Sequence, residues 1–208
     1  MEENRLLQDK LGRFYHQHKY EHGAPDKEID LTEFQTVIEK AKANHESKRY
    51  IAYTILLYWI GCRRSEPIGI KKKGIPGIVK EDIREENGSL FVKIPAFKHG
   101  QRGGENELPL NYYGIDAIKQ VWQSTKEGRR IFPFTDRTGY NFIKKQFPNK
   151  TPHHFRHNRI TKLRKKIDGK TVSVDDVKSW TGIKSDRTIQ HYGMKTQEGI
   201  HRVANVLD

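Results

Sequence analysis

One helix of the sequence is expected to bury basic side chains at its start. Three apolar residues at helical spacing mark its buried stripe: Ile160, Leu163 and Ile167. Thr151 and Pro152 precede them as an N-cap followed by proline at the first helical position. Extended backwards, the stripe meets Arg156 and then His153. A cation in a dry position is costly unless an anion meets it, so this stretch predicts a buried ion pair or a site for an anionic ligand.

A second basic segment follows an apolar helix. Gly61-Cys62-Arg63-Arg64-Ser65-Glu66 places Arg63 at the helix end, and the carboxylate of Glu66 three residues on could orient it. The alternative is an ordinary surface arginine near a helix end. His153 and His157 are four residues apart, as zinc ligands can be, but no nearby Cys or Glu completes such a set. We therefore expect no metal site and no cofactor.

Four segments together resemble the boxes of the tyrosine recombinase, or phage integrase, family. Thr151-Pro152-His153-His154-Phe155-Arg156-His157 resembles its His-x-x-Arg box, and the segment from Gly61 to Glu66 resembles its first-arginine box. Lys98 resembles the hairpin lysine, and Tyr192 is similar to the terminal nucleophile. The boxes occur in the family's order, and the resemblance covers about residues 30–195.

The resemblance implies phosphodiester cleavage by a tyrosine. Tyr192 would attack the scissile phosphate and form a 3′-phosphotyrosine, while Arg63 and Arg156 would each offer a planar fork to its oxygens. His153 would take or share the phenolic proton or donate a hydrogen bond to the phosphate. Lys98 would protonate the leaving 5′ hydroxyl. Such chemistry requires neither metal nor ATP.

The sequence departs from the family pattern in one place. The family usually has His or Trp directly after the glycine of a Leu-Gly-His segment, nine residues before the tyrosine. In this sequence Gly182 is followed by Ile183. Arg187 resembles an arginine that some archaeal viral relatives carry near that point, and it is our candidate substitute; the alternative is a solvated helix residue. Trp180 is interpreted as core.

The charge of the chain favours a polyanionic partner. Lys and Arg exceed Asp and Glu by 39 to 26, which gives the 208-residue chain a formal charge of +13. Double-stranded DNA is the first candidate and an anionic membrane surface the second; no segment is apolar enough to span a bilayer. Expected contacts to the DNA backbone are Lys71, Lys72, Lys73, Arg102 and Arg159. The lysine run could equally be a solvated face.

The expected fold is mainly α with a small three-stranded antiparallel β-sheet (α+β), the catalytic-domain fold of DNA breaking-rejoining enzymes. Alternation predicts strands near residues 90–94 and 108–110, and a third within 78–83. Residues 1–25 are interpreted as an N-terminal arm or linker, 26–192 as the catalytic domain, and 193–208 as a tail that could dock on a neighbouring subunit.

The family also implies self-association on DNA as a synaptic tetramer. The single cysteine and the absence of a secretion signal indicate the cytoplasm of a prokaryotic cell or a virus-infected host. Two other functions stay open. A type IB topoisomerase shares the Arg-Lys-Arg-Tyr chemistry, and a non-catalytic DNA-binding module could retain the scaffold.

Overall fold

The computed structural model describes residues 28–70, 72, 74–98, 101–110, 112–183 and 185–191. Its α-helices are α2 (Leu31–Ala43), α3 (Lys48–Ile60), α4 (Ile115–Gln123), α5 (Asp136–Gln146), α6 (Pro152–Asp168), α7 (Val174–Thr181) and α8 (Asp186–His191). Its strands are β1 (Gly69–Ile70), β2 (Ile75–Pro76), β3 (Ile83–Glu86), β4 (Ser89–Lys98) and β5 (Gln101–Leu110), and a short 3-10 helix, η3, covers Lys80–Asp82. The mainly α fold with a three-stranded antiparallel sheet is confirmed.

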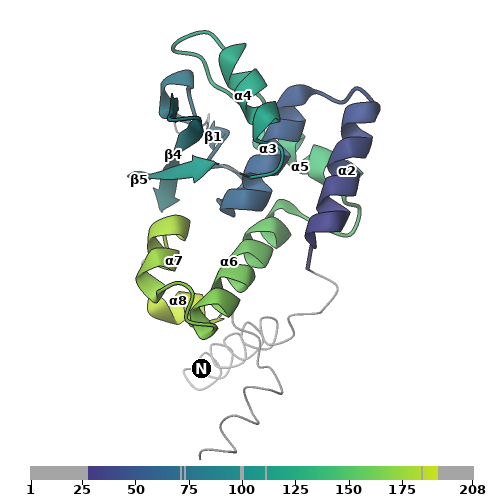
Figure 1. The fold of residues 1–208 in the computed structure, drawn as a ribbon. Helices are drawn as coiled ribbons and strands as arrows, with labels where there is room; N and C mark the ends of the chain where they lie inside the picture. The colour runs from purple at the N-terminus through teal and green to yellow at the C-terminus, as the bar shows by residue number, and fades with distance from the viewer. Residues whose placement is uncertain are drawn as a thin grey trace, which may run out of the picture.

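Helix α3 is the centre of the molecule (Figure 1). It is apolar on nearly every side, as in a helix surrounded by others, and it contacts α2, α4, α5 and α6. It ends at Gly61, whose φ of 71° is in the left-handed region that glycine adopts without strain. The sequence predicted both this helix and its end. The candidate arginine segment starts at this glycine.

The sheet is built from two consecutive hairpins in the order β3-β4-β5. Asn87 and Gly88 join β3 to β4 with φ values of 50° and 76°, the pair of positive angles that a tight type I′ hairpin requires. The third strand therefore lies further along than the predicted range 78–83. Most of that range forms η3 and a single bridge from Val79 to Arg130 instead.

Helices α6, α7 and α8 pack together in the lower half of Figure 1. Helix α7 begins at Ser173, whose side chain accepts a hydrogen bond from the Asp176 backbone N–H at 3.0 Å, and ends at Gly182 in the left-handed region. Helices α6, α7 and α8 enclose a small second core of Ile160, Val177, Ile183 and Ile189. The main core lies around α3 and includes Phe155 from the start of α6. Helix α6 thus connects the two cores.

Within the described part of the chain, no helix combines the length and apolarity needed to cross a membrane. The predicted arm of residues 1–25 and tail of residues 193–208 lie outside the described residues.

Candidate active site

The carboxyl end of α3 meets side chains from α6 and α7. The last carbonyls of a helix have no partner within it and need one elsewhere. The Tyr58 carbonyl accepts hydrogen bonds from Nε and Nη2 of Arg159 at 3.3 and 3.1 Å. The Ile60 carbonyl accepts one from the indole N–H of Trp180 at 3.2 Å. These contacts fix α6 and α7 against the end of α3, where Arg63 follows.

Arg156 lies buried between two helix ends. Its Nη1 donates to the Gly61 carbonyl at 2.8 Å and its Nη2 to the Thr181 carbonyl at 3.4 Å, and the residue is 5% exposed. Gly61 caps α3 and Thr181 is the last residue of α7, so the guanidinium lies at the negative ends of two helix dipoles. Arginine carries more N–H donors than these two contacts use, so the group can also bind an anion.

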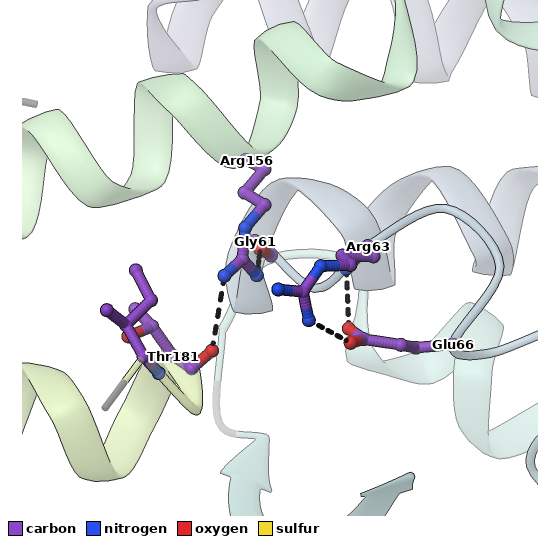
Figure 2. A network of polar contacts seen from close by, with 6 residues as sticks. Gly61, Arg63, Glu66, Arg156 and Thr181 are labelled. Carbon is purple, nitrogen blue, oxygen red and sulfur yellow. Dashed lines mark hydrogen bonds and ion pairs between the residues drawn. The ribbon is translucent and has the colours of Figure 1, made fainter. Parts of the chain in front are cut away.

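Glu66 holds Arg63 at both ends. One carboxylate oxygen accepts from the Arg63 backbone N–H at 2.6 Å, and the other accepts from Nη1 at 2.9 Å. The Glu66 side chain is 5% exposed, whereas that of Arg63 is 50% exposed. A buried carboxylate thus orients a guanidinium that still reaches solvent. Figure 2 shows the groups of Arg63 and Arg156 gathered around Gly61 at the end of α3.

A small pocket opens at this junction. It is lined by residues from the end of α3, the end of α7 and the β4–β5 hairpin: Ile60, Cys62, Arg63, Glu66, Ile94, Leu108, Trp180, Thr181 and Gly182. The carbonyl of Thr181 is also a partner of Arg156, which connects the buried guanidinium to the pocket wall. The junction thus holds one exposed and one buried guanidinium, groups of the type that donate hydrogen bonds to phosphate oxygens.

Cys62, in the wall of this pocket, is expected to be unreactive in the folded protein. Burial raises the pKa of the Cys62 thiol, and the neighbouring Glu66 carboxylate raises it further, while Arg156 opposes the shift. Because the thiolate is the reactive form, labelling by a thiol-specific dye at neutral pH should be slow in the native protein and rapid in denaturant. The sequence contains one cysteine, so the time course of labelling reports on Cys62 alone. Fast labelling of the native protein would show that Cys62 is accessible.

No protein-family model and no curated protein matches the chain. Among solved structures, it is similar to XerH site-specific recombinase bound to difH before cleavage, with a TM-score of 0.60, 15% identity, and coverage of 88% of this chain and 55% of that one. XerA recombinase gives a TM-score of 0.59 and 16% identity, with coverage of 86% of this chain and 62% of that one. A lambda integrase dimer bound to a core site gives a TM-score of 0.53 and 14% identity, with coverage of 79% of this chain and 47% of that one. The chain has the tyrosine recombinase catalytic fold. It spans about half to three-fifths of the length of these structures.

The recombinase fold places two further predicted residues in well-defined positions. His153 is in the first turn of α6, exposed, and three residues before Arg156, so both lie on one side of the helix. Arg159, one turn after Arg156, is engaged with the Tyr58 carbonyl and lies over the Trp59 ring at 5.0 Å. Burial lowers the pKa of Arg159. Its contacts are thus those of a side chain that joins α6 to α3.

The remaining predicted residues are less completely described. Lys72 and Arg187 are exposed, the latter in the first turn of α8. The backbones of Lys98 and Arg102 lie in the β4–β5 hairpin, where Lys98 pairs with Gln101, but their side chains are outside the description. Lys71, Lys73 and Tyr192 lie outside the described residues altogether. Helix α8 ends at His191, which directly precedes Tyr192.

The position after Gly182 is part of the second core. Ile183 is 7% exposed and packs with Ile160, Val177 and Ile189. Its backbone N–H donates to the Thr181 hydroxyl at 3.3 Å. Trp180, expected to be core, is only partly buried and packs against the main core while lining the pocket. The sequence did not indicate the role of its indole N–H, because the accepting carbonyl of Ile60 is 120 residues away.

Proposed function

We propose that the chain is the catalytic domain of a site-specific DNA recombinase or integrase. It cuts and rejoins double-stranded DNA through a 3′-phosphotyrosine at Tyr192. The observation that carries the proposal is the convergence of Arg63 and Arg156 on the end of α3, within a recombinase fold. Arg63 follows the end of α3 directly, whereas Arg156 comes from α6 and is 93 positions further along the chain (156 − 63 = 93).

In this mechanism the two guanidiniums neutralise the phosphate oxygens as the phenol of Tyr192 attacks. An unperturbed tyrosine has a pKa of about 10 and is a poor nucleophile at neutral pH, so the surrounding cations must favour its phenolate. His153 shares the phenolic proton, and Lys98 protonates the 5′ hydroxyl that leaves. Arg187 supplies the hydrogen-bond donor that the family's His or Trp provides, because Ile183 at that position has no polar side chain. The phosphotyrosine conserves the energy of the broken bond, so rejoining needs no ATP.

The partner is double-stranded DNA, and subunits associate on it as a synaptic tetramer. The formal charge of +13 supports a polyanionic substrate. XerH was solved as pre-cleavage and post-cleavage complexes with its DNA, and lambda integrase as a dimer on a core site. Residues 26–192 form the catalytic domain, preceded by an arm and followed by a tail. Lys71, Lys72, Lys73 and Arg102 contact the DNA backbone, and the protein works in the cytoplasm.

A nicked duplex tests this function directly. The probe is a pool of duplexes with a randomised core, in which the strand cut by the enzyme carries a 5′ dye and a nick just beyond the cleavage position. Loss of the short downstream fragment traps the intermediate. We expect a dye-labelled protein that survives denaturing electrophoresis and disappears in Tyr192→Phe.

Tyr113→Phe is the matched control, because Tyr113 donates to Glu39 on the surface, away from the pocket. This variant should form the adduct as the unsubstituted chain does, and peptide mapping should locate the dye on Tyr192. DNA binding without any adduct would favour the non-catalytic module instead. An adduct that forms equally on every sequence in the pool, with relaxation of supercoiled plasmid, would favour the topoisomerase.

A further inference from the structure

A basic cleft lies at the amino end of α3, the opposite end from the candidate active site. Its walls come from the first turn of α3, the end of α4 and the loop that leads to α5: Arg49, Ser124, Thr125, Lys126, Gly128, Arg129, Arg130 and Pro133. Half of these residues are cationic, and none carries a carboxylate. Helices α3 and α4 pack against each other, so the cleft is attached to the main core (Figure 1).

Arg49 is held in place without being neutralised. Its Nη1 donates to the Thr125 hydroxyl at 3.2 Å and to the Ile131 carbonyl. Thr125 is buried and in turn donates to the Val121 carbonyl at 2.7 Å. Both partners of the guanidinium are neutral, so its full charge remains and its direction is fixed. Such preorganisation lowers the entropic cost of binding a ligand.

The loop is also anchored. The Ile131 N–H donates to the Ile78 carbonyl at 2.9 Å, and the Lys80 N–H donates to the Arg129 carbonyl at 3.0 Å. Arg130 donates from Nη1 to the Ile68 carbonyl at 3.3 Å. Backbone pairing therefore holds Arg129 and Arg130 at the rim. Lys126 and Arg129 are exposed, so their charges face water or a ligand.

Several other cations of the described residues form ion pairs with carboxylates, such as Arg64 with Asp136 and Lys119 with Glu85. Within the part of the chain that the structure describes, Arg49, Lys126, Arg129 and Arg130 form no ion pair with a carboxylate. Two acids lie nearby: Glu81 accepts from the Gly128 backbone N–H, and the exposed Glu127 is part of the same loop. Four like charges around one hollow repel each other until an anion binds.

The position of the cleft fits a second contact with the same duplex. Arg49 and Gly61 are separated by 12 residues of α3 (61 − 49 = 12), or about 18 Å at about 1.5 Å per residue. That span corresponds to about five base-pair steps of B-DNA at about 3.4 Å each. A duplex bound at the candidate active site would reach the cleft where its axis runs along α3.

We propose that this cleft binds a backbone phosphate of the DNA, remote from the phosphate that is cleaved. The inference rests on the proposed function for the identity of its ligand. Binding there would raise the affinity for DNA of any sequence, because contacts to phosphates do not distinguish one base from another. Arg49 and Arg130 form the fixed wall, and Lys126 and Arg129 close on the phosphate from the rim.

The test is the salt dependence of binding to a short fluorescent duplex of arbitrary sequence, measured by anisotropy. Each phosphate neutralised contributes about 0.9 to the slope of log affinity against log salt. Lys126→Ala with Arg129→Ala removes the contacts to this one phosphate, so the pair should lower the slope by up to about 0.9 and weaken binding at low salt. The matched control is Lys40→Ala with Lys166→Ala, which removes the same charge from exposed lysines in the last turns of α2 and α6.

An unchanged slope in the cleft variant, or an equal fall in the control, overturns the proposal. Thermal melting checks that each variant is folded, and Lys126→Gln with Arg129→Gln replaces the alanine pair if that pair melts early. The adduct assay separates this inference from the proposed function. If the unsubstituted chain forms the adduct but the cleft variant keeps the full salt slope, only the cleft proposal is rejected. If the cleft variant has a lower slope but the unsubstituted chain forms no adduct, the cleft is supported and the catalytic role is rejected.

Discussion

Arg156→Lys is expected to slow formation of the covalent DNA adduct by about 10²–10³-fold while the chain stays folded. The two Nη atoms of Arg156 reach the Gly61 and Thr181 carbonyls in different directions, and other N–H groups of the same plane remain for a phosphate. Lysine retains the charge but has a single nitrogen, so it cannot join both helix ends and also grip the phosphate with a fork. The rate is measured in a single turnover on the nicked duplex.

Arg164→Lys provides the control for this substitution. Arg164 is on the same helix and pairs with Asp168 at 3.2 Å near the surface. An exposed pair of this kind contributes about 0–1 kcal/mol, so the variant should cleave and melt like the unsubstituted chain. If Arg156→Lys cleaves at a nearly unchanged rate, the guanidinium does not act as a fork on the phosphate, and the assigned role is wrong.

Gly61→Ala is expected to reduce the free energy of unfolding by about 2–5 kcal/mol. Gly61 has a φ of 71°, where an L-residue pays about 1–2 kcal/mol. An added Cβ would also lie 2.7 Å from Cβ and 2.8 Å from Cγ of Arg159. Relieving that overlap must move α6 away from α3 or displace the Arg159 side chain, which costs about 1–3 kcal/mol more. Urea unfolding measures the loss.

Gly88→Ala isolates the conformational part of this cost. Gly88 has a φ of 76°, and an added Cβ there meets nothing within 4 Å. Gly88→Ala should therefore reduce the free energy of unfolding only by the backbone contribution, about 1–2 kcal/mol. The excess in Gly61→Ala measures the contact between α3 and α6, and this variant alone should also slow cleavage, because the Gly61 carbonyl is a partner of Arg156. Equal losses would mean that the close approach of Arg159 is unimportant.

Local signals in the sequence were sufficient to predict much of the fold. Asp30, Thr151 and Ser173 precede helices as caps, and Gly61 and Gly182 end helices in the left-handed region. These features depend on a few neighbouring residues, so they can be read without knowledge of the tertiary structure. The third strand differed from its predicted range although its signal is also local, because the Asn87-Gly88 pair favours a tight hairpin between β3 and β4.

The candidate site was only partly predictable, for a physical reason. The buried stripe on α6 indicated that Arg156 needs an anion or a carboxylate, but its partners are the carbonyls of Gly61 and Thr181. Backbone carbonyls are present at every residue and carry no sequence signature; only the packing of α3, α6 and α7 selects these two. The basic cleft is similar, because Arg49 approaches the loop after α4 only in the folded chain.

The small core of α6, α7 and α8 has a consequence for the delivery of Tyr192, the nucleophile of the proposed function. Ile189 anchors α8 to Ile160, Val177 and Ile183, and none of these side chains belongs to the larger cluster around α3. The segment leading to Tyr192 is therefore held by a small apolar cluster, and we expect its release to cost less free energy than unfolding of the whole chain. Release of α8 alone would move the residues that lead to Tyr192, while Arg63 and Arg156 keep their hydrogen bonds to Glu66, Gly61 and Thr181.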